Sequence, residues 1–162
     1  MQVHPGDPAV RLRQVQDLAE TGWRLHELCL GSHTGSHVNA PWHMAEHGQR
    51  LEDLPLEAFV GQARVRGPKA RPCPEYGLIY AGRGIDSDEL ALILAGRPPF
   101  VGVGQGFPLD VEIERGLCQA GLVSFENLVN TELLPVDQPF LFAGLPLPME
   151  GDGSPVRAVA IL

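Results

Sequence analysis

Residues 32–43 read Ser32-His33-Thr34-Gly35-Ser36-His37-Val38-Asn39-Ala40-Pro41-Trp42-His43. This stretch holds three of the six histidines of the chain, and all six lie at or before residue 47. Histidines scattered over a protein surface would not gather in this way. We therefore predict that the stretch builds a site.

The spacing of these residues suggests what kind of site it is. In an extended chain, alternate side chains point to the same side. Those alternate positions are occupied by His33, Gly35, His37, Asn39, Pro41 and His43. Neutral imidazole is a common ligand of Zn²⁺, and Mn²⁺ or Fe²⁺ become candidates when oxygen ligands join. The spacing alone leaves two interpretations open, a metal site or histidines held by structural hydrogen bonds.

The composition indicates a soluble globular protein of one domain, residues 1–162. The chain has 162 residues, of which 44% are hydrophobic and 20% charged, values that exclude wholesale disorder. With 19 glycines and 15 prolines, short strands and many turns are expected rather than a helix bundle. The net charge of −8 repels phosphate backbones and anionic lipid surfaces, so neither nucleic acid nor a membrane is expected as a partner.

Cysteine usage and the first residues bear on the compartment. Cys29, Cys73 and Cys118 are widely spaced and form no C-x-x-C pair, a pattern typical of reduced thiols. The first residues lack the basic and apolar regions of a secretory signal, and no apolar run is long enough to span a bilayer. A cytoplasmic location is the expectation.

Hydrophobic runs and turn residues predict a mixed α/β domain dominated by strands. The predicted strands are residues 23–30, 59–65, 78–81, 100–103, 122–128, 140–147 and 156–162. Two helices are expected, one after a capping cluster at 86–89 and closed by Gly96, the other over 110–120 and closed by Gly121. Residues 66–76 are expected to form a loop.

Several segments match, in order, the pattern of one enzyme family. The stretch reads H-x-G-S-H-x-N-x-P-x-H over residues 33–43, flanked by His-Pro-Gly-Asp at 4–7, Glu-Asn-Leu at 126–128 and Gly-Ser-Pro-Val-Arg-Ala at 153–158. This arrangement resembles the metal-dependent cyclase family, whose signature is H-x-G-T-H-x-D-x-P-x-H and which includes bacterial kynurenine formamidases (arylformamidases) and isatin hydrolase-like enzymes. The resemblance covers nearly the whole chain. It implies a swivelling β/β/α domain, with strand-rich mixed sheets and helices on one side.

The resemblance also implies a metal centre and the roles of its residues. By position, His33, His37 and Glu126 would be metal ligands, with Asn39 as a weak fourth, and His43 would be the general acid or base. Two departures from the family stand out. The bridging Asp of the signature is Asn39 here, and the position twelve residues before Glu126, where the family has a histidine, holds Glu114.

These departures predict a reduced metal site. An amide oxygen is neutral and bridges two cations poorly, so we expect at most one ion, Zn²⁺ or Mn²⁺, per chain. Glu114 could supply a second-site carboxylate only if its helix turns it inward. Two histidines and one carboxylate are enough for a catalytic zinc with an open position.

Two functions from different classes remain open on the sequence. The first is hydrolysis of an amide-type bond in a small molecule, such as an arylformamide or a cyclic amide, by a metal-activated water. The alternative is a catalytically impaired relative that binds a small ligand or serves as a structural oligomer. The resemblance implies a homodimer or homotetramer in either case.

Overall fold

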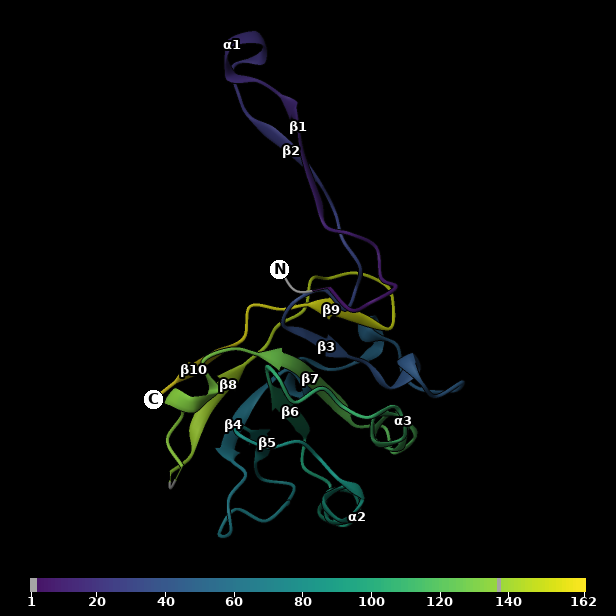
Figure 1. The fold of residues 1–162 in the computed structure, drawn as a ribbon, viewed down its shortest axis with the longest axis vertical. Coiled ribbons are helices and arrows are strands. Elements are labelled where there is room, and N and C mark those ends of the chain that lie inside the picture. The colour runs from purple at the N-terminus through teal and green to yellow at the C-terminus, as the bar shows by residue number, and fades with distance from the viewer. Residues whose placement is uncertain (1–2, 137) are drawn as a thin grey trace.

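The computed structural model describes residues 3–136 and 138–162, and its main element is one large curled sheet (Figure 1). Its eight strands lie in the order β10-β8-β4-β5-β6-β7-β3-β9. The bounds, in chain order, are β3 His37–Asn39, β4 Val60–Val65, β5 Gly77–Tyr80, β6 Phe100–Gly104, β7 Val123–Leu128, β8 Phe140–Ala143, β9 Gly153–Pro155 and β10 Val159–Ile161. The four central strands β4 to β7 are parallel to one another, and every other pairing in the sheet is antiparallel.

Two helices connect the parallel strands and lie on the same side of the sheet (Figure 1). They are α2, Ser87–Gly96, and α3, Val111–Gln119, and each is capped by an aspartate that accepts a backbone N–H bond. Parallel strands need such crossovers, since a tight turn can join only antiparallel ones. The mixed sheet with helices on one side confirms the predicted fold class.

Side chains alternate between two hydrophobic cores, one on each face of the sheet. On the helix side, Leu78, Val101 and Leu117 belong to one buried cluster. On the opposite face, Phe100, Phe125 and other apolar residues pack inside the curl of the sheet. The ring centroids of Phe100 and Phe125 are 5.7 Å apart. A strand that is buried on both faces reads as a continuous apolar run, which is why the central strands could be predicted from the sequence.

The structure differs from the sequence-based expectations in several segments. The stretch 33–43 is not extended throughout, because Gly35 has a positive φ of 67° and Pro41 begins a 3₁₀ turn, Pro41–His43. Only His37–Asn39 pair as a strand, and further 3₁₀ turns occupy Leu51–Asp53, Leu56–Ala58 and Thr131–Leu133. The predicted strand at 23–30 is shorter, β2 Leu25–Cys29, and pairs with a strand that the sequence did not reveal, β1 Arg11–Gln16.

The hairpin of β1 and β2 projects away from the rest of the molecule (Figure 1). A short helix, α1 Leu18–Thr21, closes its far end. We call residues 11–29 the arm. Nearly all of its residues are exposed to solvent, so it contributes little to either core.

A buried ion pair ties α2 to the sheet. The carboxylate of Glu89 accepts two bonds from Arg66, each 2.9 Å long, and a third from the Tyr80 hydroxyl at 3.0 Å. Arg83 approaches the same carboxylate at 3.1 Å. Burial alone would raise the pKa of Glu89, but these donors hold it below its ordinary value.

Glu89→Gln is expected to destabilise the protein by about 3 kcal/mol, because it leaves the buried Arg66 without a counter-charge. Urea unfolding followed by circular dichroism measures the effect. The matched control is Glu112→Gln, which removes a carboxylate from an exposed pair with Arg115 and should cost about 0.5 kcal/mol or less. Equal losses in the two variants would show that the Glu89 pair is energetically no different from a surface pair.

Candidate metal centre

The two strands that carry the site are held in a register that places their polar residues opposite one another. His37 of β3 pairs with Glu126 of β7, and Asn39 pairs with Ser124. Between them Val38 and Phe125 point to the opposite face and join the core inside the curl. Because side chains alternate along a strand, all four polar residues face the side covered by α3.

The helix α3 supplies a third carboxylate. Its buried face carries Ile113, Glu114, Leu117 and Cys118, and Glu114 lies against the Asn39 amide. The condition set on this residue is therefore met, since the helix does turn it inward. We call His37, Asn39, Glu114, Ser124 and Glu126 the floor of the site; all but Glu126 are buried.

Asn39 is the centre of the floor. Its Nδ2 donates to Glu114 and, at 3.0 Å, to Oε1 of Glu126, while its Oδ1 lies 2.8 Å from Nδ1 of His33. Ionised carboxylates only accept hydrogen bonds, so the amide nitrogen must face them and the amide oxygen must face His33. A neutral donor thus stands between two carboxylates.

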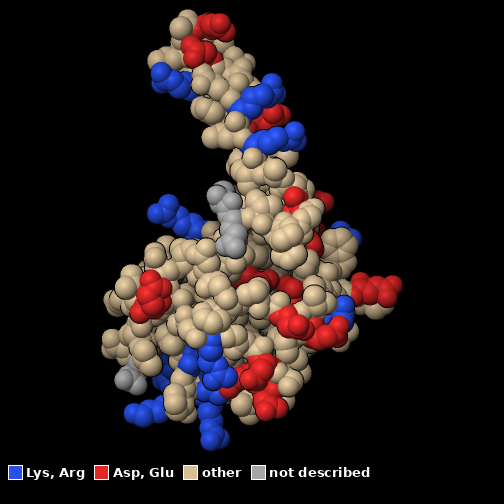
Figure 2. Space-filling model, in the orientation of Figure 1, with Lys and Arg blue, Asp and Glu red and all other residues tan. Residues whose placement is uncertain are grey.

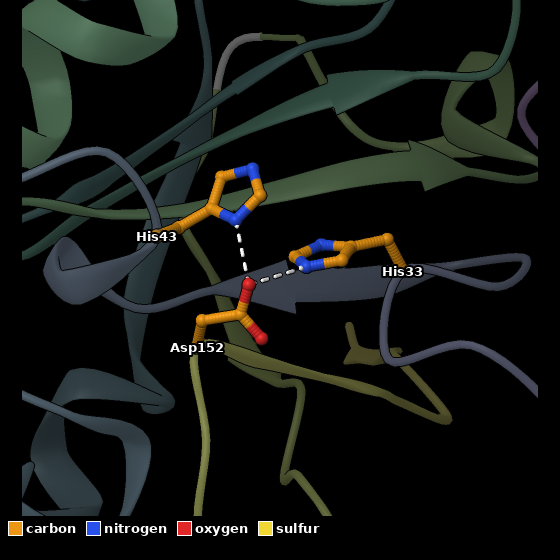
Figure 3. A group of neighbouring side chains, drawn as sticks. All are labelled: His33, His43 and Asp152. Carbon is orange, nitrogen blue, oxygen red and sulfur yellow. Dashed lines mark hydrogen bonds and ion pairs between the residues drawn. The ribbon is translucent and has the colours of Figure 1, made fainter. Parts of the chain in front are cut away.

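Three further residues form the rim of the site, above the floor. Asp152 Oδ2 lies 3.0 Å from Nε2 of His33 and 2.8 Å from Nδ1 of His43 (Figure 3). The two imidazole rings are 4.2 Å apart between centroids. All three side chains remain partly accessible, with 20%, 23% and 35% of the His33, His43 and Asp152 side chains exposed. The rim is therefore more accessible than the floor, where 6% of the His37 side chain and 12% of the Glu126 side chain are exposed.

Asp152 was not among the site residues predicted from the sequence. It lies 119 positions from His33, just before β9, and the fold alone brings the two together. Its backbone oxygen accepts from the Ala40 N–H at 2.8 Å, and Ser32 donates to its Oδ1 at 3.3 Å. The only signal available was its place directly before the Gly-Ser-Pro-Val-Arg-Ala segment.

The charges of the site perturb one another. Hydrogen bonds from His33 and His43 hold the pKa of Asp152 far below its usual range. Burial opposes the charging of His33, but the bonded Asp152 raises the pKa of His33 on balance. Burial, together with the nearby charge of Glu126, raises the pKa of Glu114. Burial also acts on Glu126, yet the adjacent imidazole of His37 and a bond from the Leu109 N–H lower its pKa.

The donor set suits a divalent metal ion. The structure brings together three imidazoles, three carboxylates and one amide, the ligand types that Zn²⁺ and Mn²⁺ accept. In the described part of the chain, one group of three acidic, histidine or cysteine side chains is close enough to share an ion: His33, His43 and Asp152. Their donor atoms all lie within 4.8 Å of one another. This His-His-Asp cluster could hold an ion.

The predicted ligands also lie within the site, although nothing yet tests their role. His37 Nδ1 lies 2.9 Å from the backbone oxygen of Gly35, so this nitrogen carries the proton and Nε2 is free. That free nitrogen lies 3.6 Å from Oε1 of Glu126, too far for a good hydrogen bond. The assignment of His33, His37, Asn39 and Glu126 as ligands, and of His43 as acid or base, stays a prediction.

Among the described residues, no helix is both long and apolar enough to cross a membrane.

Comparison with solved structures finds the same fold in other proteins. An isatin hydrolase bound to the product analogue thioisatinate superposes with a TM-score of 0.78 at 16% identity, over 100% of this chain and 86% of the other. Isatin hydrolase A from Ralstonia solanacearum gives 0.76 at 17% identity, covering 99% and 85%. A potential metal-dependent hydrolase with cyclase activity gives 0.74 at 18% identity, covering 99% and 90%.

Sequence comparison gives closer relationships. The kynurenine formamidase of Salinibacter ruber is 31% identical over 97% of this chain and 90% of its own length. That of Geobacillus thermodenitrificans is 30% identical over 96% and 89%. The Cyclase family model, described as "Putative cyclase", matches residues 1–81. The resemblance drawn from the sequence is thereby confirmed, and the chain belongs to the cyclase family.

Proposed function

We propose that this protein is a hydrolase that cleaves an amide-type, non-peptide C–N bond in a small molecule, using one bound divalent metal ion. The relatives named kynurenine formamidase align over almost the whole chain, and proteins named isatin hydrolase share its fold. The substrate class is therefore an arylformamide or a cyclic amide.

The observation that carries this proposal is the position of Asp152 between His33 and His43. A carboxylate that binds the outer nitrogen of an imidazole fixes the ring and raises its basicity as a ligand. With Nε2 of His33 bonded to Asp152, its Nδ1 is directed to the floor beside the Asn39 oxygen. His33 Nδ1, His37 Nε2 and Glu126, with the Asn39 oxygen, then form the ligand set.

The same carboxylate prepares His43 for proton transfer. Its Nδ1 donates to Asp152, so Nε2 carries the lone pair and lies 3.8 Å from Oε1 of Glu114. A histidine held in this way can accept a proton from water and return it to a leaving amine. When bound, the ion would polarise the carbonyl of the substrate and lower the pKa of water.

The arrangement of the floor supports a single ion per chain. Family members that use two metals need a bridging carboxylate at position 39, and here the amide nitrogen of Asn39 fills the space between Glu114 and Glu126. The rim remains accessible and the acid or base remains oriented. These features favour a working enzyme over an impaired relative.

The experiment measures metal content and hydrolysis together. Purified protein loaded with Zn²⁺ or Mn²⁺ should bind one ion and hydrolyse N-formylkynurenine or a member of a panel of cyclic amides. His37→Ala should lower both metal content and activity, whereas His43→Ala should keep the metal and lose at least about a hundredfold in kcat. Loss of the metal in His43→Ala and not in His37→Ala would move the ion to the rim cluster of His33, His43 and Asp152. Metal binding without hydrolysis of any substrate on the panel would favour the ligand-binding alternative.

A further inference from the structure

The connection from β4 to β5 gathers positive charge on an acidic protein. Residues 64–71 read Arg-Val-Arg-Gly-Pro-Lys-Ala-Arg and hold four of the twelve basic residues of the chain, with no acidic residue among them. The whole chain carries a net charge of −8. Figure 2 shows Lys and Arg side chains gathered over the lower end of the molecule, where this connection lies in Figure 1. Such a local excess of positive charge attracts anions that the rest of the surface repels.

Two arginines of this segment differ in their partners. The guanidinium of Arg66 donates two hydrogen bonds to the Glu89 carboxylate. The Nε of Arg64, only two positions earlier, is buried and has no hydrogen-bond partner. Within residues 3–136 and 138–162, neither Arg64 nor Lys69 forms an ion pair. Because folded proteins rarely leave a buried N–H group unpaired, the Nε of Arg64 indicates a ligand.

A cavity of about 140 Å³ opens beside Arg64. One wall is the turn of residues 67–70, which is closed by a backbone hydrogen bond of 3.1 Å, and Val136 lines another side. One water molecule occupies roughly 30 Å³ in the liquid, so the cavity has room for a group of four or five heavy atoms. The strands β5 and β6 separate β4 from β7, and the cavity is therefore distinct from the candidate metal centre.

The ring of Tyr76 sets the orientation of the Arg64 guanidinium. The Cζ of Arg64 lies 3.9 Å from the ring centroid. A guanidinium that stacks on an aromatic face is held through its plane, while its N–H groups point outward within that plane. Its edge can then donate two parallel hydrogen bonds to one oxyanion. The ammonium group of Lys69, on the wall of the same cavity, supplies a second positive charge.

We propose that this cavity binds a phosphate group, either as the free ion or as part of a small phosphate monoester. The edge of the Arg64 guanidinium takes two of the phosphate oxygens, and the Lys69 ammonium takes a third. A group with close to two negative charges at neutral pH matches two cations better than a carboxylate with one charge does. The proposal does not depend on the proposed hydrolase function.

The first test is calorimetric titration of the whole chain with inorganic phosphate, at low ionic strength and with a chelator, so that no metal-bound anion contributes. One phosphate should bind per chain. Arg64→Gln should weaken binding at least about tenfold, which corresponds to about 1.4 kcal/mol. Lys69→Gln, at an exposed position of the turn, should weaken it about threefold without affecting folding.

The matched control is Arg24→Gln, which removes the same charge from an exposed position of the arm and should leave the dissociation constant within about twofold. Absence of phosphate binding to the wild type would overturn the proposal. So would wild-type affinity in both Arg64→Gln and Lys69→Gln, which would place the anion elsewhere. An equal loss in Arg24→Gln would show that only the net charge matters, and would also overturn it.

The second test compares ligands and side-chain geometry. Acetate should bind at least about tenfold more weakly than phosphate, and equal affinity would overturn the assignment to a phosphate group. Arg64→Lys keeps the charge but loses the planar fork, so it should bind phosphate as poorly as Arg64→Gln. Wild-type affinity in Arg64→Lys would contradict the bidentate contact. Glycerol 3-phosphate distinguishes the two sources, since tighter binding than that of inorganic phosphate supports a monoester and weaker binding supports the free ion.

Discussion

Asp152→Asn is expected to lower kcat/KM by at least about a hundredfold and to weaken metal binding by about ten- to a hundredfold. The new side chain has one acceptor oxygen and one amide group in place of two acceptor oxygens. It cannot accept from both His33 and His43 through one charged oxygen, as Asp152 does at 3.0 and 2.8 Å. Steady-state kinetics and metal titration measure the two losses separately.

Glu150→Gln is the matched control for Asp152→Asn. It removes a carboxylate two positions earlier in the same connection, where the side chain is exposed, and should leave both quantities unchanged. Rescue distinguishes positioning from general damage. Asp152→Glu keeps the charge and should recover part of the activity, whereas Asp152→Asn should not. Wild-type kinetics in Asp152→Asn would show that Asp152 has no role in catalysis.

Asn39→Asp is expected to make the stability of the protein depend on metal. The change removes the two N–H bonds to Glu114 and Glu126 and places a third carboxylate among them. Without metal we expect a loss of about 3 kcal/mol in the free energy of unfolding. A divalent ion should reverse it, since ligand at a hundred times its dissociation constant adds about 2.7 kcal/mol.

The double change Asn39→Asp with Glu114→His should then bind two ions per chain and hydrolyse formamide or cyclic amide substrates faster than the wild type. Metal analysis and thermal unfolding, each with and without chelator, test this directly. Asn130→Asp makes the same chemical change at an exposed position and should show no dependence on metal. One ion per chain in the double variant would mean that the floor rejects a second metal for a reason other than Asn39.

Local sequence could predict the central strands and both helices, because each is an apolar run or an amphipathic stretch with its own caps. Local sequence could also locate the floor, since His37, Asn39 and Glu126 belong to short sequence motifs. The strand β1 was missed because its residues are mostly polar and exposed, so no burial pattern marks it. The strand β1 pairs only with β2, in a hairpin that projects away from the rest of the molecule.

Asp152 escaped prediction for a different reason. Its partners lie 119 and 109 positions away, and no local pattern encodes such a contact. The shape of the stretch 33–43 was also mispredicted, although its members do meet. Gly35 and Pro41 bend the chain, so the alternation of an extended chain does not hold over the whole stretch, and the bend separates the rim histidines from the floor.

The separation of floor and rim has a consequence for how such a protein can diversify. The floor is held by the pairing of β3 with β7 and by α3, so a change there disturbs the sheet itself. The rim uses connecting segments, because His33 and Asp152 lie just outside strands and His43 lies in a 3₁₀ turn. A groove of about 580 Å³ is lined by arm residues such as Arg13 and Leu28 and by Leu147 and Met149 of the connection between β8 and β9. Connections tolerate substitution and insertion far better than paired strands do. Substrate preference can therefore drift through the 144–151 connection while the chemistry below it stays fixed.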